Sequence, residues 1–143
     1  MKYSQKAEFD KANCFGLGDP NDAYAQYFDG QSYLNALTES GKAPLFLANV
    51  TFEPGTRNHW HVHYADKGGG QILICTAGEG WYQEEGKPAR RLMAGDVVVT
   101  HKGIKHWHGA TKDSWFEHLA ITAGNSEFLE PVTDELYKGL ENQ

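Results

Sequence analysis

The middle of the chain alternates between short apolar runs and turns rich in Gly, Pro and Asp. Runs of this length, bounded by turn residues, are typical of β-strands. Regularly spaced strands of this kind predict a small sandwich or barrel. We expect strands at Leu45–Phe52, Gln71–Thr76, Trp81–Gln83, Arg90–Met93, Val97–Thr100, Lys105–His108 and Trp115–Thr122.

The N-terminal part of the chain has a different pattern. Residues 1–42 are polar with scattered aromatic side chains, and Tyr24, Tyr27 and Phe28 have loose helical spacing. This spacing predicts a short helix. We expect residues 1–42 to form an arm that packs on the barrel or on a partner subunit.

The pattern changes again after residue 123. Thr133 is expected to cap a short C-terminal helix, and the two acidic residues that follow it favour the positive end of the helix dipole. The expected organisation is therefore an arm, a barrel over residues 43–123 and a helical tail over residues 124–143.

Length and charge narrow the class of protein. A chain of 143 residues is the size of one domain. Its net charge of −6 argues against nucleic acid or an anionic membrane as the main partner. It contains no apolar run of roughly 18 residues, the length of a membrane span. The first ten residues lack the apolar core of a secretory signal, so we expect a cytoplasmic protein in which Cys14 and Cys75 are reduced.

The histidines are concentrated in the predicted barrel. All seven lie between residues 59 and 118, and four form two His-x-His pairs, His61/His63 and His106/His108. Residues i and i+2 of a strand point to the same face, so each pair aims two imidazoles in one direction. Several imidazoles that converge on an interior typically hold a divalent transition metal.

Two longer motifs resemble those of the cupins. The first is Gly55-(x)5-His61-x-His63 followed by Gln71-(x)6-Gly78, and the second is Gly95-(x)5-His101-x-Gly103-(x)2-His106. This resemblance covers about residues 50–122. It implies an all-β, single-domain antiparallel barrel with a central metal, to which the arm and the short C-terminal helix are added.

The chain departs from the usual cupin pattern at four places. Gln71 stands where most cupins have Glu, the loop from Tyr64 to Gly70 is longer than usual, His101 replaces a Pro and Ala110 replaces an Asn. Asp66 on the long loop is an alternative oxygen ligand. Whether this loop gates the pocket stays open.

The chain resembles one narrower group of cupins more closely. It consists of small bacterial cupins associated with carboxymuconolactone decarboxylase-like proteins, and it includes the manganese-dependent cupin hydroxynitrile lyases. Similar stretches are His61-x-His63, Gly70-Gln71-x-Leu73-Ile74, Gly78-x-Gly80-Trp81-x-Gln83, Gly95-Asp96-Val97-Val98 and Lys105-His106-Trp107-His108-Gly109-Ala110.

This resemblance implies a ligand set and a metal. The ligands would be His61, His63, Gln71 and His106, and they would hold one divalent transition metal per chain. Manganese is the expected metal, with iron, nickel, zinc and cobalt as alternatives. His108 and His118 would line the pocket beside the metal.

The residues themselves indicate a chemistry for these positions. If His106 faces inward, so does His108, with Trp107 outside. A first shell of imidazoles and an amide is neutral, so the metal would keep its full positive charge and polarise a hydroxyl or carbonyl strongly. His108 and His118 would act as general base and acid.

Three functions remain open. The first is a metal-dependent lyase or acid–base catalyst on small hydroxy or carbonyl compounds, similar to the hydroxynitrile lyases. The second is an iron-dependent dioxygenase, and the third is a cupin that binds a small ligand without catalysis. Gln71, His108 and His118 could also be structural barrel residues. A homodimer or homotetramer is expected, with a small molecule as the substrate.

Overall fold

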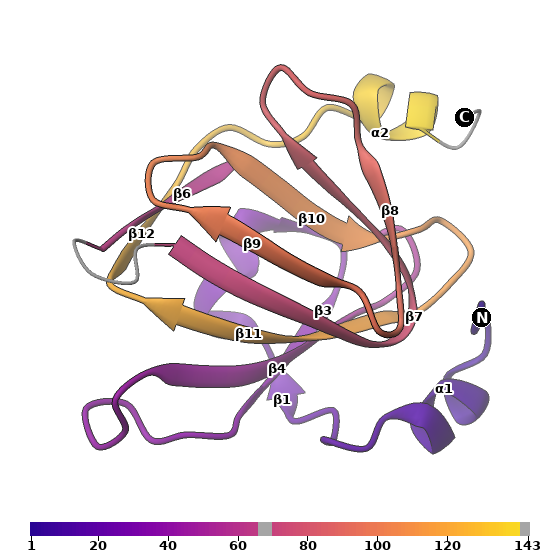
Figure 1. Cartoon of the computed structure of the whole chain (residues 1–143). Helices are drawn as coiled ribbons and strands as arrows, with labels where there is room; N and C mark the ends of the chain where they lie inside the picture. The colour runs from indigo at the N-terminus through magenta and orange to yellow at the C-terminus, as the bar shows by residue number, and fades with distance from the viewer. Residues whose placement is uncertain (66–69, 141–143) are drawn as a thin grey trace.

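The computed structural model describes residues 1–65 and 70–140. Within these residues an antiparallel sheet curls round on itself, as Figure 1 shows. Asp66 and most of the loop from Tyr64 to Gly70 lie outside the described residues. None of the described helices is long and apolar enough to cross a membrane.

The elements follow one another as short strands with a helix near each end. The helices are α1 (Lys6–Ala12), the 3-10 helix η1 (Asp22–Tyr27) and α2 (Asp134–Leu140). The strands are β1 (Asp19–Pro20), β2 (Phe28–Asp29), β3 (Ser32–Ala36), β4 (Phe46–Phe52), β5 (Arg57–Asn58), β6 (His61–Tyr64), β7 (Gly70–Glu84), β8 (Arg90–Met93), β9 (Val97–His101), β10 (His106–Ala110), β11 (Phe116–Ala123) and β12 (Asn125–Phe128).

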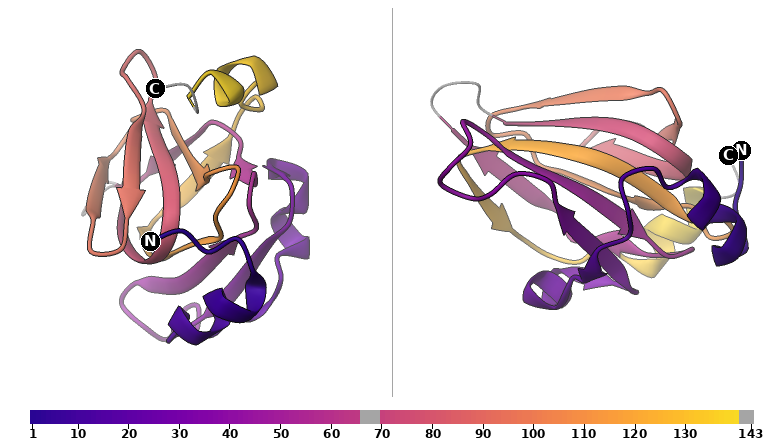
Figure 2. Two further views of the ribbon diagram at one scale, coloured as in Figure 1. Left: turned by 90° about the vertical axis from the view of Figure 1, so that its right-hand side faces the viewer. Right: turned by 90° about the horizontal axis from the view of Figure 1, so that it is seen from below.

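Strand β7 joins the two halves of the barrel. Its first half pairs with β11 and β9, and its second half pairs with β10 and β8. Strands β4 and β3 extend the first half beyond β11, while β6, β5 and β12 extend the second half around β10. The two views of Figure 2 show the curled sheet that results.

The sequence predicts two separate strands, Gln71–Thr76 and Trp81–Gln83, but the structure has the single strand β7 across both, with Gly78 between them. Gly78 has a φ of +77°, which residues with a Cβ rarely adopt. In addition, a Cβ at this position would lie 1.8 Å from the carbonyl oxygen of Trp115. The register of β11 against β7 shifts between Glu117 and His118. The glycine therefore bends one long strand between the two halves and does not end it.

The core fills the space between the two halves. Leu73, Cys75, Phe116 and Ala120 belong to it, as the strand period predicts for one inward face. Trp107 points to the other side of β10, where it packs with Trp60, Trp81 and residues of α2. The all-β barrel predicted from the sequence is confirmed.

The N-terminal part contains more structure than the sequence predicts. The expected helix is the short η1, while α1 and strand β3 are additional. Helix α1 has one buried residue, Phe9, whose ring stacks on Trp115 with the centroids 5.4 Å apart. In Figure 1, α1 lies below the barrel and α2 above it.

The C-terminal helix forms where it is expected. The hydroxyl of Thr133 accepts a hydrogen bond from the backbone N–H of Leu136 at 3.2 Å. Arg57 fixes the start of α2, because its guanidinium donates to Val132 O and to Asp134 Oδ1 and lies 4.4 Å from the ring centroid of Tyr137. Before the helix, the chain adds strand β12 along β6.

Candidate metal centre

Three histidines meet inside the barrel. His61 and His63 come from β6 and His106 from β10, and these strands pair directly at His61 and His106. One ring nitrogen from each histidine lies within 4.8 Å of those of the other two. All three side chains are buried. This cluster could hold a metal ion.

Backbone carbonyls fix the orientation of two of these rings. Nδ1 of His61 donates to the carbonyl oxygen of His59 at 2.9 Å, and Nδ1 of His106 donates to that of Ile104 at 2.9 Å. A ring that donates through Nδ1 keeps a lone pair on Nε2. The strand periodicity therefore brings the rings together, and the local backbone selects the tautomer that binds metals.

One of these lone pairs has no partner. Nε2 of His106 is buried and makes no hydrogen bond, although the ring is enclosed on all sides. Buried polar atoms are rarely left unsatisfied. A divalent cation bound by His61, His63 and His106 would satisfy this atom, so the donor set fits a metal of the imidazole-binding class.

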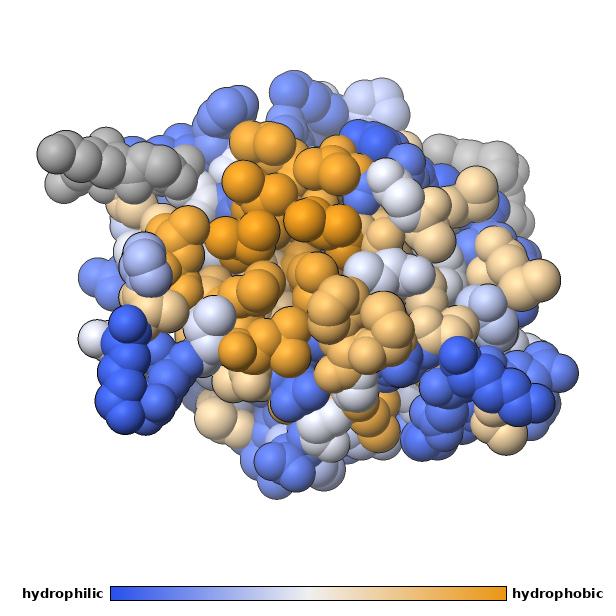
Figure 3. All heavy atoms as spheres, turned by 60° about the horizontal axis from the view of Figure 1, so that its bottom comes forward, coloured by the Kyte–Doolittle hydropathy of each residue, from blue (hydrophilic) through white to orange (hydrophobic). Residues whose placement is uncertain are grey.

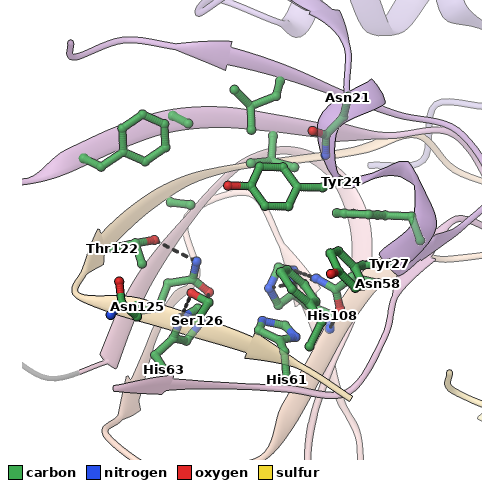
Figure 4. Close-up of a pocket in the computed structure, with 18 of the residues that line it drawn as sticks. Asn21, Tyr24, Tyr27, Asn58, His61, His63, His108, Thr122, Asn125 and Ser126 are labelled. Carbon is green, nitrogen blue, oxygen red and sulfur yellow. Dashed lines mark hydrogen bonds between the residues drawn. The ribbon is translucent and has the colours of Figure 1, made fainter. Parts of the chain in front are cut away.

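Gln71 and Ser126 complete the surroundings of His63. Ser126 Oγ lies 2.7 Å from His63 Nδ1, and Gln71 Oε1 lies 3.2 Å from His63 Nε2. The amide nitrogen of Gln71 donates to Thr122 Oγ1 at 3.0 Å. This bond turns the amide oxygen toward the histidines, the direction a metal ligand requires. Figure 4 shows His63, Ser126 and Thr122 together at one side of the pocket.

Burial keeps the cluster neutral. It lowers the pKa of His61 well below the ordinary value, with further contributions from His106 and His63, and it also lowers the pKa of His63. The pKa of His106 falls to about 4, mainly because of burial. Neutral imidazole is the form that binds metals.

A second histidine pair lies beside the cluster. His118 Nε2 is 3.1 Å from His108 Nδ1, so one proton lies between the two rings. The rings of His61 and His108 have their centroids 5.3 Å apart. Burial lowers the pKa of His118 to about 4, and burial followed by the nearby His118 lowers that of His108 well below the usual range. Both rings are therefore neutral bases.

Asn58 of β5 binds His108 at two places. Its Oδ1 accepts the backbone N–H of His108 at 2.9 Å, and its Nδ2 lies 3.2–3.3 Å from the two nitrogens of the ring. Nδ1 of His118 is buried without a partner. In this pair the His108 ring is therefore held by the amide of Asn58, whereas the His118 ring keeps one buried nitrogen without a hydrogen bond.

His61, His63, His108 and His118 line a pocket of about 920 Å³. In Figure 4, Tyr24 lies across this pocket from His61 and His63. Tyr27 stacks on Phe128 of β12 with the centroids 4.3 Å apart, and Phe128 in turn lies over His61. Among the described lining residues there is no Lys or Arg, and Glu127 is the one carboxylate. The pocket is thus aromatic and weakly charged.

The structure brings most of the predicted site together. His61, His63 and His106 form the cluster, Gln71 lies at its edge, and His108 and His118 stand next to it. Asp66, the alternative ligand, lies outside the described residues. The functions of these residues are predictions that the geometry leaves open.

The sequence did not indicate several neighbours of the site. Asn58 stands at one of the unspecified positions of the first motif, Ser126 reaches the site from a short strand that carries no motif, and Tyr24 and Tyr27 come from the N-terminal arm. Strand β12 pairs Ser126 directly with His63. The aromatic spacing in the arm was visible in the sequence, but its place over the pocket was not.

Comparisons with known proteins agree on one family. The family described as "Cupin domain" matches residues 48–122. An (R)-mandelonitrile lyase from Granulicella tundricola is 42% identical over 119 residues, which are 80% of this chain and 88% of that protein.

Solved structures give the same result. A cupin-like protein from Thermotoga maritima has a TM-score of 0.80 and 40% identity, over 90% of this chain and 96% of that chain. The DMSP lyase DddQ from Ruegeria pomeroyi has a TM-score of 0.59 and 25% identity, over 78% of this chain and 56% of that chain.

Proposed function

This chain belongs to the cupin family, and from that premise we propose that it is a metal-dependent lyase for small, uncharged hydroxy or carbonyl compounds. Cleavage of a cyanohydrin is the reaction we propose. The observation that carries the proposal is the neutral His108–His118 pair beside the three-histidine cluster, in a chain that is 42% identical to a mandelonitrile lyase.

The ligands we propose are His61, His63, His106 and the amide oxygen of Gln71. Manganese is the metal we propose, one ion per chain, and when bound it would supply a Lewis acid that polarises the substrate oxygen. The unpartnered Nε2 of His106 and the bond from Gln71 to Thr122 support this set. Because all four ligands are neutral, they would leave the charge of the ion undiminished.

The histidine pair would carry the proton. His108 takes the proton of the substrate hydroxyl, the carbon–oxygen bond becomes a carbonyl, and the bond between this carbon and cyanide breaks. The cyanide then takes the proton from the histidine pair and leaves as hydrogen cyanide beside the aldehyde. The lowered pKa of both rings keeps them unprotonated at neutral pH before the reaction, and it makes a protonated ring a stronger acid that returns the proton to cyanide.

The wall of the pocket supports an uncharged substrate. A substrate carboxylate away from the proposed metal would call for a basic side chain, and the described lining offers none. Tyr24, Tyr27 and Phe128 offer aromatic surface near His61. An apolar or aromatic group next to the reacting carbon would therefore pack against these three rings.

The test is cleavage of mandelonitrile by the manganese-loaded protein, followed as aldehyde release, with wild type and His108→Ala side by side. We expect turnover by wild type and a loss of about 10²–10⁴-fold in the variant, at unchanged metal content, because general acid–base catalysis contributes that much. His101→Ala, at an exposed histidine, is the matched control.

Other outcomes would favour the other functions. Unchanged activity of His108→Ala would contradict the role given to this residue. Turnover that requires iron and consumes O₂ would indicate a dioxygenase. Tight binding of small hydroxy compounds without turnover of any of them would indicate a binding protein.

A further inference from the structure

The pocket beside the three-histidine cluster has two apolar walls of different character. The first consists of aromatic rings from η1 and β12, namely Tyr24, Tyr27 and Phe128. The second consists of aliphatic side chains from β3, β4 and β11, namely Leu34, Ala48, Val50 and Ala120, and we call these four residues the aliphatic wall. Strand β12 extends the second half of the barrel, whereas β4 and β11 belong to the first half. A substrate with a single apolar group would therefore occupy only one of the two walls.

Two alanines form a trough in the aliphatic wall. Ala120 and Ala48 are direct partners across β11 and β4, so their methyl groups lie side by side. The neighbours of Ala48 on the inner face of β4 are larger, because Phe46 and Val50 stand two residues away on either side. The trough therefore runs across two strands between these larger side chains.

This trough lies next to the groups to which we assign the reaction. On β11 the side chains of His118, Ala120 and Thr122 share the inner face. His118 is the second ring of the histidine pair, and the hydroxyl of Thr122 accepts the hydrogen bond from the amide of Gln71. The trough is therefore bounded by the proposed base on one side and by the support of a proposed metal ligand on the other.

Small side chains in these strands are confined to the inner side. On β11 the two residues that flank Ala120 are Leu119 and Ile121, which point to the outer side of the sheet, and Leu47 does so on β4. The broad orange area of Figure 3 shows apolar residues gathered on this outer side. The strands therefore carry large apolar residues outside and leave room inside, where the pocket lies.

The proposed chemistry leaves one position of the reacting carbon free. Cleavage of a cyanohydrin moves the proton of the hydroxyl and breaks the bond to cyanide, so the two other substituents of this carbon keep their bonds. One of them would pack on the aromatic wall. In the cyanohydrin of an aldehyde the other is a hydrogen atom, which would leave the trough empty. The pocket of about 920 Å³ is near the upper end of the range for small-molecule sites, about 300–1,000 Å³, and has room for a larger substituent.

We propose, on the basis of the proposed function, that the substrate is the cyanohydrin of a ketone. Its reacting carbon carries a larger, aromatic group that packs on Tyr24, Tyr27 and Phe128, and a short alkyl group that fills the trough at Ala48 and Ala120. The hydroxyl proton passes to the histidine pair, the bond to cyanide breaks, and cyanide leaves with the electron pair of that bond and takes the proton. The products are the ketone and hydrogen cyanide, and no further reactant is needed.

The first test compares two cyanohydrins that differ only at the reacting carbon. Mandelonitrile carries a hydrogen atom there, and the cyanohydrin of propiophenone carries an ethyl group. The manganese-loaded wild type should cleave the ketone cyanohydrin with a kcat/KM at least equal to that for mandelonitrile. Ala120→Val fills the trough, so the ratio of the two kcat/KM values, ketone cyanohydrin over mandelonitrile, should fall about tenfold or more, since two carbon atoms lose their apolar contact.

The second test measures binding and needs no turnover. Two unreactive alcohols, 1-phenylethanol and 2-phenylbutan-2-ol, differ by the same ethyl group, and in both a methyl group stands in place of the nitrile. Their affinities for the protein as purified are measured by NMR titration. Wild type should bind the tertiary alcohol about tenfold more tightly, because its ethyl group is buried in the trough. Ala120→Val should bind the two alcohols equally.

A valine in the same row outside the pocket is the matched control. Ala36 of β3 is the partner of Ala48, but it is exposed and does not line the pocket. Ala36→Val should therefore keep both wild-type ratios. Circular dichroism shows whether each variant folds, and Ala48→Val, which fills the trough from the neighbouring strand, takes the place of Ala120→Val if that variant does not fold.

Three results would overturn the proposal. The first is a wild-type protein that binds the two alcohols equally, and the second is a preference for the tertiary alcohol that persists when the trough is filled. The third is turnover of mandelonitrile without turnover of the ketone cyanohydrin, which would leave the proposed lyase activity in place. Turnover of neither cyanohydrin by wild type would instead contradict the proposed function itself, so the two failures are distinguishable.

Discussion

Asn58 holds His108 through the backbone and the ring at once. Its Oδ1 accepts the His108 N–H at 2.9 Å, while its Nδ2 approaches the ring nitrogens at 3.2–3.3 Å. Both residues are buried. Nε2 of His118 lies 3.1 Å from Nδ1 of the His108 ring. The orientation of His108 is therefore set by two neighbours, Asn58 and His118, which come from different strands.

Replacing Asn58 should impair turnover and leave metal binding intact. Asn58→Ala frees the ring of His108, and we expect kcat to fall about ten- to hundredfold, the usual effect of losing a residue that orients a functional histidine. KM should change little. Asn58→Asp keeps the acceptor for the backbone and loses the N–H groups, so it separates the two contacts. A kcat equal to that of wild type in both variants would exclude this positioning role.

Thr122 should control metal affinity through Gln71. Thr122→Val removes the acceptor that holds the amide nitrogen of Gln71, so the amide oxygen loses its fixed direction. We expect manganese to bind about tenfold more weakly, measured by competition with a chelator. Thr122→Ser keeps the hydroxyl and should bind as wild type does. Equal affinity of the Val and Ser variants would show that this bond does not orient a ligand.

The metal-free protein should lose stability in mild acid. Burial lowers the pKa of His118 from 6.5 to about 4, so the unfolded chain binds a proton more readily than the folded chain. Stability is therefore complete above pH 6.5 and falls as the pH drops toward 4. One such histidine accounts for about 2 kcal/mol of unfolding free energy between pH 6.5 and 5.

His118→Phe provides the comparison for this pH effect. After treatment with EDTA, urea unfolding at pH 7 and pH 5 should show a smaller difference for the variant than for wild type. His106, whose pKa is also about 4, continues to contribute in both proteins. The same pH difference in both proteins would mean that His118 is not the buried neutral base described above.

The two cysteines should differ sharply toward thiol reagents. Cys14 is exposed, whereas Cys75 is buried and its pKa is raised to about 12, chiefly by burial. Only thiolate reacts. At pH 8 the folded protein should therefore show one rapidly reacting thiol, and the second should appear only in denaturant. Two equivalents that react at once in the folded protein would contradict the burial of Cys75.

The strand period accounts for what could be predicted about the site. His61 with His63, and His106 with His108, share a face because side chains alternate, and the same rule places Trp107 outside. These features depend on neighbours two residues apart in the sequence. They could be predicted without knowledge of how the strands pair.

Features that depend on long-range pairing could not be predicted. Ser126 contacts His63 because β12 pairs with β6, and Asn58 contacts His108 because β5 lies next to β10. The stretch around Gly78 separates the predicted strands Gln71–Thr76 and Trp81–Gln83, since glycine usually marks a turn. In the sheet it bends β7, and only the close approach of the Trp115 carbonyl shows why a glycine is needed there.

The most direct test of the account is metal analysis of protein purified without a histidine tag. We expect close to one equivalent of manganese per chain in wild type and in His101→Ala. His61→Ala and Gln71→Ala should both lose it, because each removes one proposed ligand. A wild-type protein that contains no metal and cannot be loaded with manganese or another divalent transition metal would contradict the metal centre and, with it, the proposed lyase activity.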